Sequence, residues 1–209
     1  MTIIKTGSSI PPIGDGLVIA KRNGNYHYRR APQRKVKDSW TPQQVLHRQR
    51  FSLVNKFCGL FKHSLIPQIW NYEAVIMSGY SLFLKTNMPA FAADGSIADV
   101  KKIMLSTGKL PFPSDLTALP LESEPGILEV SWHKEPFLKG ERQSDELMII
   151  SVADGHYSEI TATNVKRWDL KGSFQLPPVP LAATHFYLLF ASKDRRDYSP
   201  SVCFLLEKV

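Results

Sequence analysis

The run Phe186-Tyr-Leu-Leu-Phe190 consists of five large apolar or aromatic residues with no charge between them. It belongs to a series of short apolar segments that begins after Asp115 and recurs at regular spacing toward the end of the chain. Turn-rich connections separate the segments, which is typical of a small β-sandwich. Seven strands are therefore predicted, within Leu116–Leu121, Gly126–Trp132, Glu146–Val152, Tyr157–Val165, Gly172–Leu176, His185–Ala191 and Val202–Leu206.

The chain before Asp115 has helical periodicity instead. A helix is predicted to begin at Thr41-Pro42, because threonine is a favoured N-cap and proline loses nothing at the first helical position. Its buried stripe is predicted at helical spacing. The stripe comprises Leu46, Leu53, Phe57 and Leu60, widened by Phe51, Val54, Cys58 and Phe61.

A second helix is predicted after Pro67, from Ile69 to about Lys85, and Asn87-Met-Pro89 ends it. Gly79 weakens this prediction because glycine is a poor helix former. The following segment, 97–110, is compatible with either a strand or a short helix.

The amino-acid composition limits the classes of protein to which this chain can belong. Of the 209 residues 43% are apolar, which is enough for a core and excludes a disordered or collagen-like chain. No stretch approaches the roughly 18–20 apolar residues of a membrane helix, and the first residues lack the apolar run of a secretory signal. We therefore expect a soluble, cytoplasmic protein with no membrane span.

The net charge of +7 is concentrated near the start of the sequence. Residues 1–50 carry ten Lys and Arg against two Asp, a net of +8, whereas the remainder carries 16 bases against 17 acids, a net of −1. Charge asymmetry of this kind indicates an anionic partner, such as nucleic acid, a membrane surface or an acidic protein face.

A β-hairpin is predicted around Asn23-Gly24, since this dipeptide favours the type I′ turn. Cations and aromatics on a two-stranded ribbon are one way to bind nucleic acid. The more ordinary interpretation, a solvated charged face with packed tyrosines, is favoured because no named nucleic-acid motif is present. The candidate polyanion-binding residues are Lys21, Arg22, Tyr26, Tyr28, Arg29, Arg30, Arg34, Lys35 and Lys37.

The C-terminal half resembles a fibronectin type III domain. The resemblance rests on Leu128-Glu-Val-Ser-Trp132, similar to that family's second strand with its buried tryptophan. It also rests on Leu189-Phe-Ala191 followed by Tyr198-Ser-Pro-Ser201, similar to the sixth strand and final turn. It implies an immunoglobulin-like sandwich that serves as an interaction or spacer module.

In such a sandwich the third, sixth and seventh strands share one sheet. A solvated sheet alternates apolar and polar residues, but Leu147-Met-Ile-Ile150, Phe186–Phe190 and Val202-Cys-Phe-Leu-Leu206 are apolar on both faces. We therefore predict that the outer face of this sheet is covered by the helix around Leu46–Phe61. Burial of that face in an oligomer is the alternative.

The first half resembles a family of uncharacterised bacterial proteins of about 200 residues, frequent in Bacteroidetes. The residues behind this resemblance are Lys21–Arg30, Thr41-Pro-Gln-Gln44, Arg48-Gln-Arg-Phe51 and Leu105-Ser-Thr-Gly108. It implies an N-terminal α/β region joined to an immunoglobulin-like half, and it implies no activity.

Catalytic and metal-binding motifs are lacking. The chain has no nucleophile elbow, P-loop, zinc-protease helix motif or dinucleotide-binding fingerprint, and its six histidines are scattered singly. Cys58 and Cys203 belong to no ligand cluster; two free, buried thiols are favoured over a disulfide. Asp194 and Asp197 bracket Arg195-Arg196, and the simplest interpretation of these four charges is local ion pairing.

The sequence thus predicts an α+β protein in two parts. Residues 1–113 form a basic hairpin and helices, and residues 114–209 form a seven-stranded fibronectin type III-like sandwich. The predicted function is a non-catalytic structural or protein-interaction module, with no cofactor, no metal and no small-molecule substrate, that binds a protein partner or a second copy. The alternative is nucleic-acid or polyanion binding through the basic hairpin.

Overall fold

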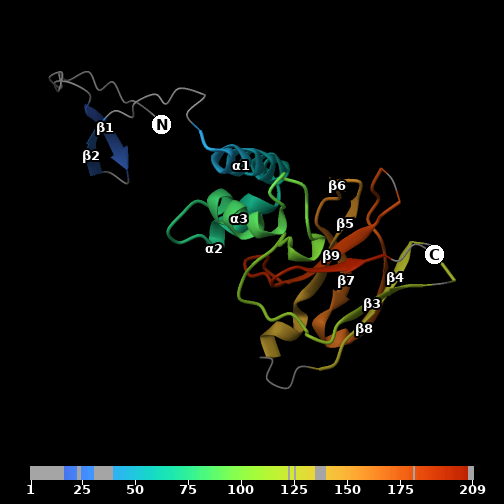
Figure 1. The fold of residues 1–209 in the computed structure, drawn as a ribbon. Helices are drawn as coiled ribbons and strands as arrows, with labels where there is room; N and C mark the ends of the chain where they lie inside the picture. The colour runs from blue at the N-terminus through green and yellow to red at the C-terminus, as the bar shows by residue number, and fades with distance from the viewer. Residues whose placement is uncertain are drawn as a thin grey trace. The chain divides into compact units, whose positions relative to one another are not determined.

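The computed structural model in Figure 1 is an α+β structure with a few helices and antiparallel sheets. The chain falls into two compact units, Met1–Pro42 and Gln43–Val209, and each is described by itself. The residues that the structure describes are 17–22, 25–30, 40–121, 123–124, 126–134, 140–180 and 182–206.

The first unit contains the predicted hairpin. Strands β1 (Leu17–Arg22) and β2 (Asn25–Arg30) pair antiparallel, with Lys21 opposite Tyr26 and Ile19 opposite Tyr28. The hairpin is therefore confirmed at the level of the backbone, whereas its predicted turn at Asn23-Gly24 lies outside the described residues.

The second unit begins at the second residue of a helix, and we call residues 42–113 the helical segment. Its longest helix starts at Pro42, as predicted. The elements are α1 (Pro42–Leu60), a single π-helical turn η2 (Ile66–Trp70), α2 (Asn71–Glu73), α3 (Gly79–Asn87) and the short 3₁₀ turns η3 (Met88–Ala90) and η4 (Val100–Lys102).

The prediction of one helix from Ile69 to Lys85 is wrong, because the chain leaves the helical conformation at Ala74. A new helix then begins at Gly79, with Ser78 as its N-cap; the Ser78 side chain accepts a hydrogen bond from the Ser81 amide. Glycine is required here, since a Cβ on Gly79 would lie 2.6 Å from the Asn71 backbone nitrogen.

The sheets follow. A three-stranded sheet has the order β3-β4-β8, and a five-stranded sheet has the order β10-β9-β5-β6, with β7 also paired to β5. Each predicted strand segment contains a strand, and the segment Tyr157–Val165 divides between two. The strands are β3 (Thr117–Pro120), β4 (Ile127–Ser131), β5 (Glu146–Ala153), β6 (His156–Tyr157), β7 (Thr161–Lys166), β8 (Lys171–Gln175), β9 (His185–Ala191) and β10 (Val202–Leu205). Two 3₁₀ turns, η5 (Gly140–Ser144) and η6 (Arg167–Asp169), connect them.

Strands β5 and β9 are buried on both faces. On one face Leu147 and Leu188 join a core shared with the three-stranded sheet, which we call the inter-sheet core. On the other face Ile150 and Leu189 join a core shared with the helices, which we call the helix–sheet core. Figure 1 shows α1 and α3 on one side of β9 and the strands β3, β4 and β8 on the other.

The predicted helical cover over this sheet is confirmed, but the buried arc of α1 differs from the predicted one. Val54, Phe57 and Cys58 are buried in the helix–sheet core, and Phe61 follows them just past the helix end. Leu46, Leu53 and Leu60 belong to the predicted stripe and are exposed instead. They occupy the neighbouring arc of the helix, where Leu53 packs against Gly95.

Specific hydrogen bonds fix the helical segment on the sheet. The Trp70 indole donates to the Leu105 carbonyl at 2.9 Å, and the Ser201 hydroxyl accepts from the Leu105 amide at 2.9 Å. Asn87 also holds this stretch, because its side chain both donates to the Met104 carbonyl and accepts from the Met104 amide. Residues 43–206 therefore share one compact unit, and the division predicted at 113/114 stays a prediction.

Candidate functional site

The residues predicted to bind polyanions lie in the first unit. Lys21 and Arg22 end β1, and Tyr26, Tyr28, Arg29 and Arg30 lie on β2. The register places Lys21, Tyr26, Tyr28 and Arg30 on one face of the hairpin backbone. Arg34, Lys35 and Lys37 lie outside the described residues, so this site stays a prediction.

The two cysteines are free, and their surroundings oppose nucleophilic chemistry. Cys58 is fully buried, and burial raises the pKa of its thiol to about 12. Burial also raises the pKa of Cys203. Because the thiolate is the reactive form, both side chains are poor nucleophiles at neutral pH.

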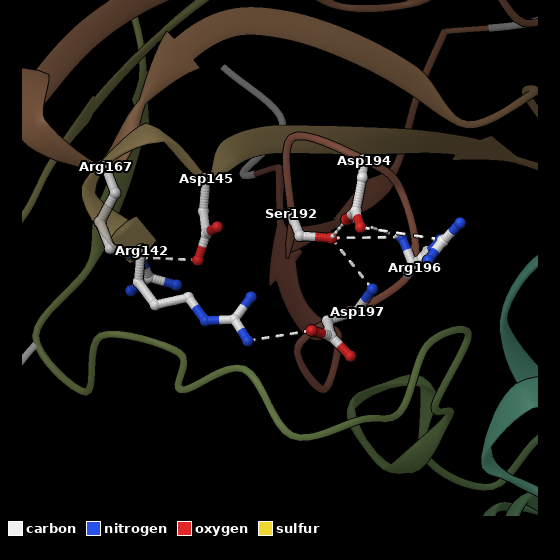
Figure 2. Close-up of polar contacts among 7 residues, drawn as sticks. All are labelled: Arg142, Asp145, Arg167, Ser192, Asp194, Arg196 and Asp197. Carbon is white, nitrogen blue, oxygen red and sulfur yellow. Dashed lines mark hydrogen bonds and ion pairs between the residues drawn. The ribbon is translucent and has the colours of Figure 1, made fainter. Parts of the chain in front are cut away.

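Figure 2 shows a cluster of charged residues at one end of the sheets, which we call the charged cluster; it comprises Arg142, Asp145, Arg167, Asp194, Arg196 and Asp197. Asp145 and Arg167 form its interior, each with a side chain 2% exposed and 3.8 Å from the other. The Arg167 guanidinium also donates to the Pro111 carbonyl at 2.7 Å and lies 3.9 Å from the centre of the Phe190 ring. A buried ion pair of this kind carries a high cost if one partner is lost.

The outer part of the charged cluster orders the loop between β9 and β10. Arg142 donates to Asp197 at 2.9 Å, and the Ser192 hydroxyl donates to Asp194 at 2.7 Å while it accepts from the Asp197 amide (Figure 2). A hollow of about 550 Å³ adjoins these residues. Local ion pairing was predicted for this loop and is found between Asp194 and Arg196, but Asp197 pairs with Arg142 instead. The acidic and basic side chains pair with one another, which is the arrangement of a cluster that stabilises the fold.

An exposed Asp–His pair is the nearest approach to a catalytic arrangement. The His133 amide and ring nitrogen both contact the Asp115 carboxylate, and this hydrogen bonding lowers the pKa of Asp115. The neighbouring hydroxyl of Ser131 bonds to Thr117 at 2.9 Å rather than to His133. The pair thus lacks an engaged nucleophile. Within the described ranges, no group of three His, Cys, Asp or Glu could hold a metal ion.

Exposed apolar side chains are distributed unequally over the described part of Gln43–Val209. The sheets carry two large ones, Leu119 and Leu205, and Trp168 lies on the turn η6. Isolated exposed apolar residues are normal, whereas contiguous ones mark interaction surfaces. The helical segment carries the other ten. These residues are Val45, Leu46, Phe51, Leu53, Leu60, Tyr72, Val75, Ile76, Met77 and Ile97.

Three of these residues form a row along α1, which we call the leucine row: Leu46, Leu53 and Leu60. They are 45%, 38% and 60% exposed. A spacing of seven residues is almost two helical turns, with a drift of only about 20° per step, so the three side chains lie on one arc of the helix. The row therefore presents three separate apolar side chains, about 10 Å apart along the helix axis, beside the buried arc of α1.

The leucine row ends in a hollow of about 630 Å³ between the end of α1 and the β5–β7 region, which we call the seam groove. Leu60 belongs to both features. Aromatic packing fixes the groove wall, since the Tyr157 ring lies edge-on to Phe61 with centroids 5.0 Å apart. Its apolar lining is Leu60, Phe61, Leu65, Tyr157, Ile160 and Pro180, and its polar lining includes His63, Gln68, His156, Ser158 and Glu159. A second hollow of about 480 Å³ shares Gln68 and Ile160 with it.

The charge around the leucine row is of both signs, because Glu159 lines the seam groove with Leu60, and Asp94 adjoins Gly95, which packs against Leu53. Residues 39–72 contain no Asp or Glu, while Arg48, Arg50, Lys56 and Lys62 carry positive charge. Arg50 is partly used in the fold, because it donates to the Met88 carbonyl at 2.6 Å. The leucine row therefore lies among basic residues of α1 and acidic residues of other segments.

The sequence did not predict this site. Leu46, Leu53 and Leu60 were expected in the core, and the residues of the seam groove come from segments nearly 100 positions apart. Of the charged cluster, Arg142, Asp145 and Arg167 also carried no local signal. No protein family, curated protein or solved structure matches the chain. The resemblances to fibronectin type III domains and to the bacterial family therefore stay predictions.

Proposed function

We propose that the protein is a non-catalytic protein-interaction module that docks a segment of a partner along the leucine row and into the seam groove. The observation that carries this proposal is the row of part-exposed leucines, Leu46, Leu53 and Leu60, which ends at a walled hollow. Because the leucines are 38–60% exposed, burial of the exposed part would contribute roughly 0.6–1.8 kcal/mol for each of them. Folding covers the remainder of each side chain, and a partner can cover the part that stays exposed.

We further propose that the two sheets form a fibronectin type III-like sandwich, which serves as the scaffold for the helical segment. The distribution of strands supports it: the first, second and fifth predicted segments form one sheet, and the third, fourth, sixth and seventh form the other. Both sheets contribute to the inter-sheet core. In this arrangement the helical segment, and not a sandwich loop, carries the binding surface.

The absence of an engaged nucleophile or metal cluster in the described residues supports a non-catalytic role. Cys58 is protonated and enclosed, and the Asp115–His133 pair lies in solvent. The charged cluster is organised around its own ion pairs.

Peptide selection tests the docking proposal. A phage-displayed peptide library is selected against the full chain, and the selected peptides are measured by fluorescence anisotropy. We expect Leu46→Gln/Leu60→Gln to weaken binding at least about tenfold, because two apolar contacts are lost.

The matched control is Leu119→Gln/Leu205→Gln, which removes two exposed leucines from the sheets. We expect it to leave the affinity within about twofold of the parent chain. The proposal is wrong if no peptide binds, or if the selected peptides bind the Leu46→Gln/Leu60→Gln chain as tightly as the parent.

Polyanion binding through the hairpin is a second candidate function, supported by the register that places Lys21, Tyr26, Tyr28 and Arg30 on one face. Phosphate contacts release counterions, so affinity for mixed-sequence DNA or RNA should fall steeply with salt. A titration at low and at physiological salt tests it. No binding at low salt would eliminate this candidate.

A further inference from the structure

We infer that the outer edge of β10 pairs with the same edge of a second copy of this chain, so that two molecules join through one antiparallel ladder. This surface is separate from the leucine row and the seam groove, and the inference does not depend on the proposed function. Three features of the described residues support it: the outward backbone groups of β10, the contrast with the other sheet edges and the fit of the strand to its own copy.

Strand β10 pairs on one side only, since its sole neighbour among the described strands is β9. The Leu206 amide donates to the Thr184 carbonyl at 3.0 Å, so these two residues form a hydrogen-bonded pair of the ladder. Hydrogen-bonded pairs alternate with non-hydrogen-bonded ones along an antiparallel ladder. Cys203 and Leu205 therefore direct their N–H and C=O groups away from β9.

The chain itself uses this edge just before β10. The Ser201 amide donates to the Ser106 carbonyl at 3.2 Å, so a main-chain partner already lies beside the edge at that point. Among the described strands, none continues alongside Cys203 and Leu205. Two donors and two acceptors are thus directed toward a further strand.

The other edges of the two sheets carry features that hinder strand pairing. Strand β3 ends in Pro120, which has no N–H group. Strand β7 is irregular, because its register with β5 shifts after Glu146 and Asn164 has a left-handed φ of 64°. Strand β8 packs against β7, since a Cβ on Gly172 would lie 2.6 Å from the Val165 side chain. Strand β6 has only two residues.

Strand β10 has none of these features. Its sequence, Val202-Cys-Phe-Leu205, contains no proline and no charge, and its register with β9 is continuous. Leu205 is 52% exposed. Donors and acceptors that recur at every second residue match an extended backbone, whereas a helix has already used its own. The partner that this edge fits is therefore a strand.

A second copy supplies a strand that matches the edge. In an antiparallel pair centred on Phe204, Cys203 of each copy lies opposite Leu205 of the other, and each of these pairs exchanges both of its hydrogen bonds. Phe204 then lies opposite its own equivalent, with the two Cα atoms about 4.5 Å apart. This contact would extend an existing stack, because the Phe204 and Phe186 rings are stacked with centroids 5.5 Å apart.

The composition of β10 favours its own copy over a foreign strand. Because the strand carries no charge, symmetric pairing places no like charges opposite one another in the ladder. Phe204 and Leu206 are only partly buried at the border of the inter-sheet core, and symmetric pairing covers them in both copies at once. The two-fold axis also closes the assembly at two copies, since each copy contributes this one edge.

Analytical ultracentrifugation of the full chain tests the inference. We expect a reversible monomer–dimer equilibrium with a Kd on the order of 10–100 µM, because so short a ladder buries less area than a stable complex does. Leu205→Pro should weaken dimerisation at least about tenfold, since it deletes an outward N–H and leaves the ladder with β9 intact. Leu205→Lys should have a similar effect, because lysine on an edge opposes pairing.

Two variants serve as matched controls. Ala118→Pro places a proline at an outward position of β3, because the Leu121 amide bonds to the Ile127 carbonyl and the alternation turns Ala118 away from β4. Leu46→Gln/Leu60→Gln changes the leucine row. Both should leave the dimer affinity within about twofold of the parent chain. Urea denaturation of each variant at a concentration below the Kd shows that the monomer is folded.

A cross-link tests the register. Leu205→Cys places a thiol opposite Cys203 of the second copy, with Cα atoms about 5.5 Å apart, which is within the range of a disulfide. We expect mild oxidation to give a covalent dimer that non-reducing electrophoresis detects. Leu205→Cys/Cys203→Ser should remain unlinked.

A chain that stays monomeric up to about 1 mM would overturn the inference. So would a Leu205→Pro chain that dimerises as tightly as the parent, which would mean that the edge is not paired, or assembly through β10 beyond two copies. If the chain stays monomeric but binds extended peptides that Leu205→Pro no longer binds, the occupant is a foreign strand and the second copy is wrong. The docking proposal is unaffected by these outcomes, because it is tested by substitutions in the leucine row.

Discussion

The helical segment and the two sheets bury their inner surfaces equally well but differ in their outer surfaces. On the three-stranded sheet the outward positions are mainly polar, such as Glu129 and Ser131 on β4 and Ser173 on β8. The helical segment exposes the leucine row and the adjacent pair Val75 and Ile76, which are 93% and 94% exposed. A surface of polar side chains is stable in contact with water and can serve as a scaffold. Exposed apolar side chains are stabilised only when another molecule covers them.

The largest expected effect concerns the charged cluster, which belongs to the sheets. Asp145→Ala leaves the buried Arg167 guanidinium without its carboxylate and should lower the free energy of unfolding by roughly 3–5 kcal/mol. Urea denaturation measures it. The control is Lys102→Ala, which breaks the exposed Lys102–Asp99 pair of the helical segment and should cost less than about 1 kcal/mol. Similar small losses of unfolding free energy in both variants would show that the charged cluster does not stabilise the fold.

Neighbouring leucines on β9 test whether the two regions bury the central sheet equally. Leu188 faces the inter-sheet core and Leu189 faces the helix–sheet core, and both are fully buried. Each Leu→Ala substitution should therefore lower the free energy of unfolding by about 2–5 kcal/mol in urea titrations. A nearly neutral Leu189→Ala would mean that the helical segment does not cover this face in solution.

A smaller effect is expected from the pH dependence of stability. Burial lowers the pKa of His185 on β9 below its usual value of 6.5. The unfolded chain then binds more protons than the folded chain between the folded pKa and 6.5, so the stability from neutral His185 is present above pH 6.5 and is lost as the pH falls through that window.

We expect His185→Gln to flatten the fall in unfolding free energy between pH 7 and pH 5, as measured by urea denaturation at each pH. His156→Gln, at an exposed position, should keep the slope of the parent chain. Parallel curves for His185→Gln and the parent would contradict this assignment.

The smallest expected effect is at the most exposed apolar pair. Val75→Ser/Ile76→Ser should change the free energy of unfolding by less than about 0.5 kcal/mol per substitution, because these side chains gain nothing on folding. Leu119→Ser on β3 is the matched change on the sheets. A loss above about 2 kcal/mol for the loop pair would show that its side chains pack in the fold, and the contrast between the two regions would disappear.

Strand positions were predictable because each buried strand leaves a short apolar segment bounded by turns. The start of α1 was predictable from Thr41 and Pro42, whose preferences are local. The buried arc of α1 was not, since apolar residues occupy more than half of its circumference and periodicity alone does not select between Leu53 and Val54. The break at Ala74 was missed because it depends on the contact of Gly79 with Asn71.

The candidate site was less predictable than the fold. The seam groove joins Leu60 to Ile160, and the charged cluster joins Arg142 to Asp197. Such pairs leave no pattern in a single sequence, because neither partner's residue type is unusual for its own segment.

By itself the sequence determined the α+β class, the strand series, the hairpin and the separation of charge, because each depends on residue type and short-range spacing. It also showed that one sheet needs cover on both faces, since a doubly apolar strand is costly to leave in water. Only the tertiary structure decided which arc of α1 supplies that cover and which arc stays outside as the leucine row. That choice depends on how the helix is rotated against β5 and β9, and the rotation is set by packing between residues distant in the chain.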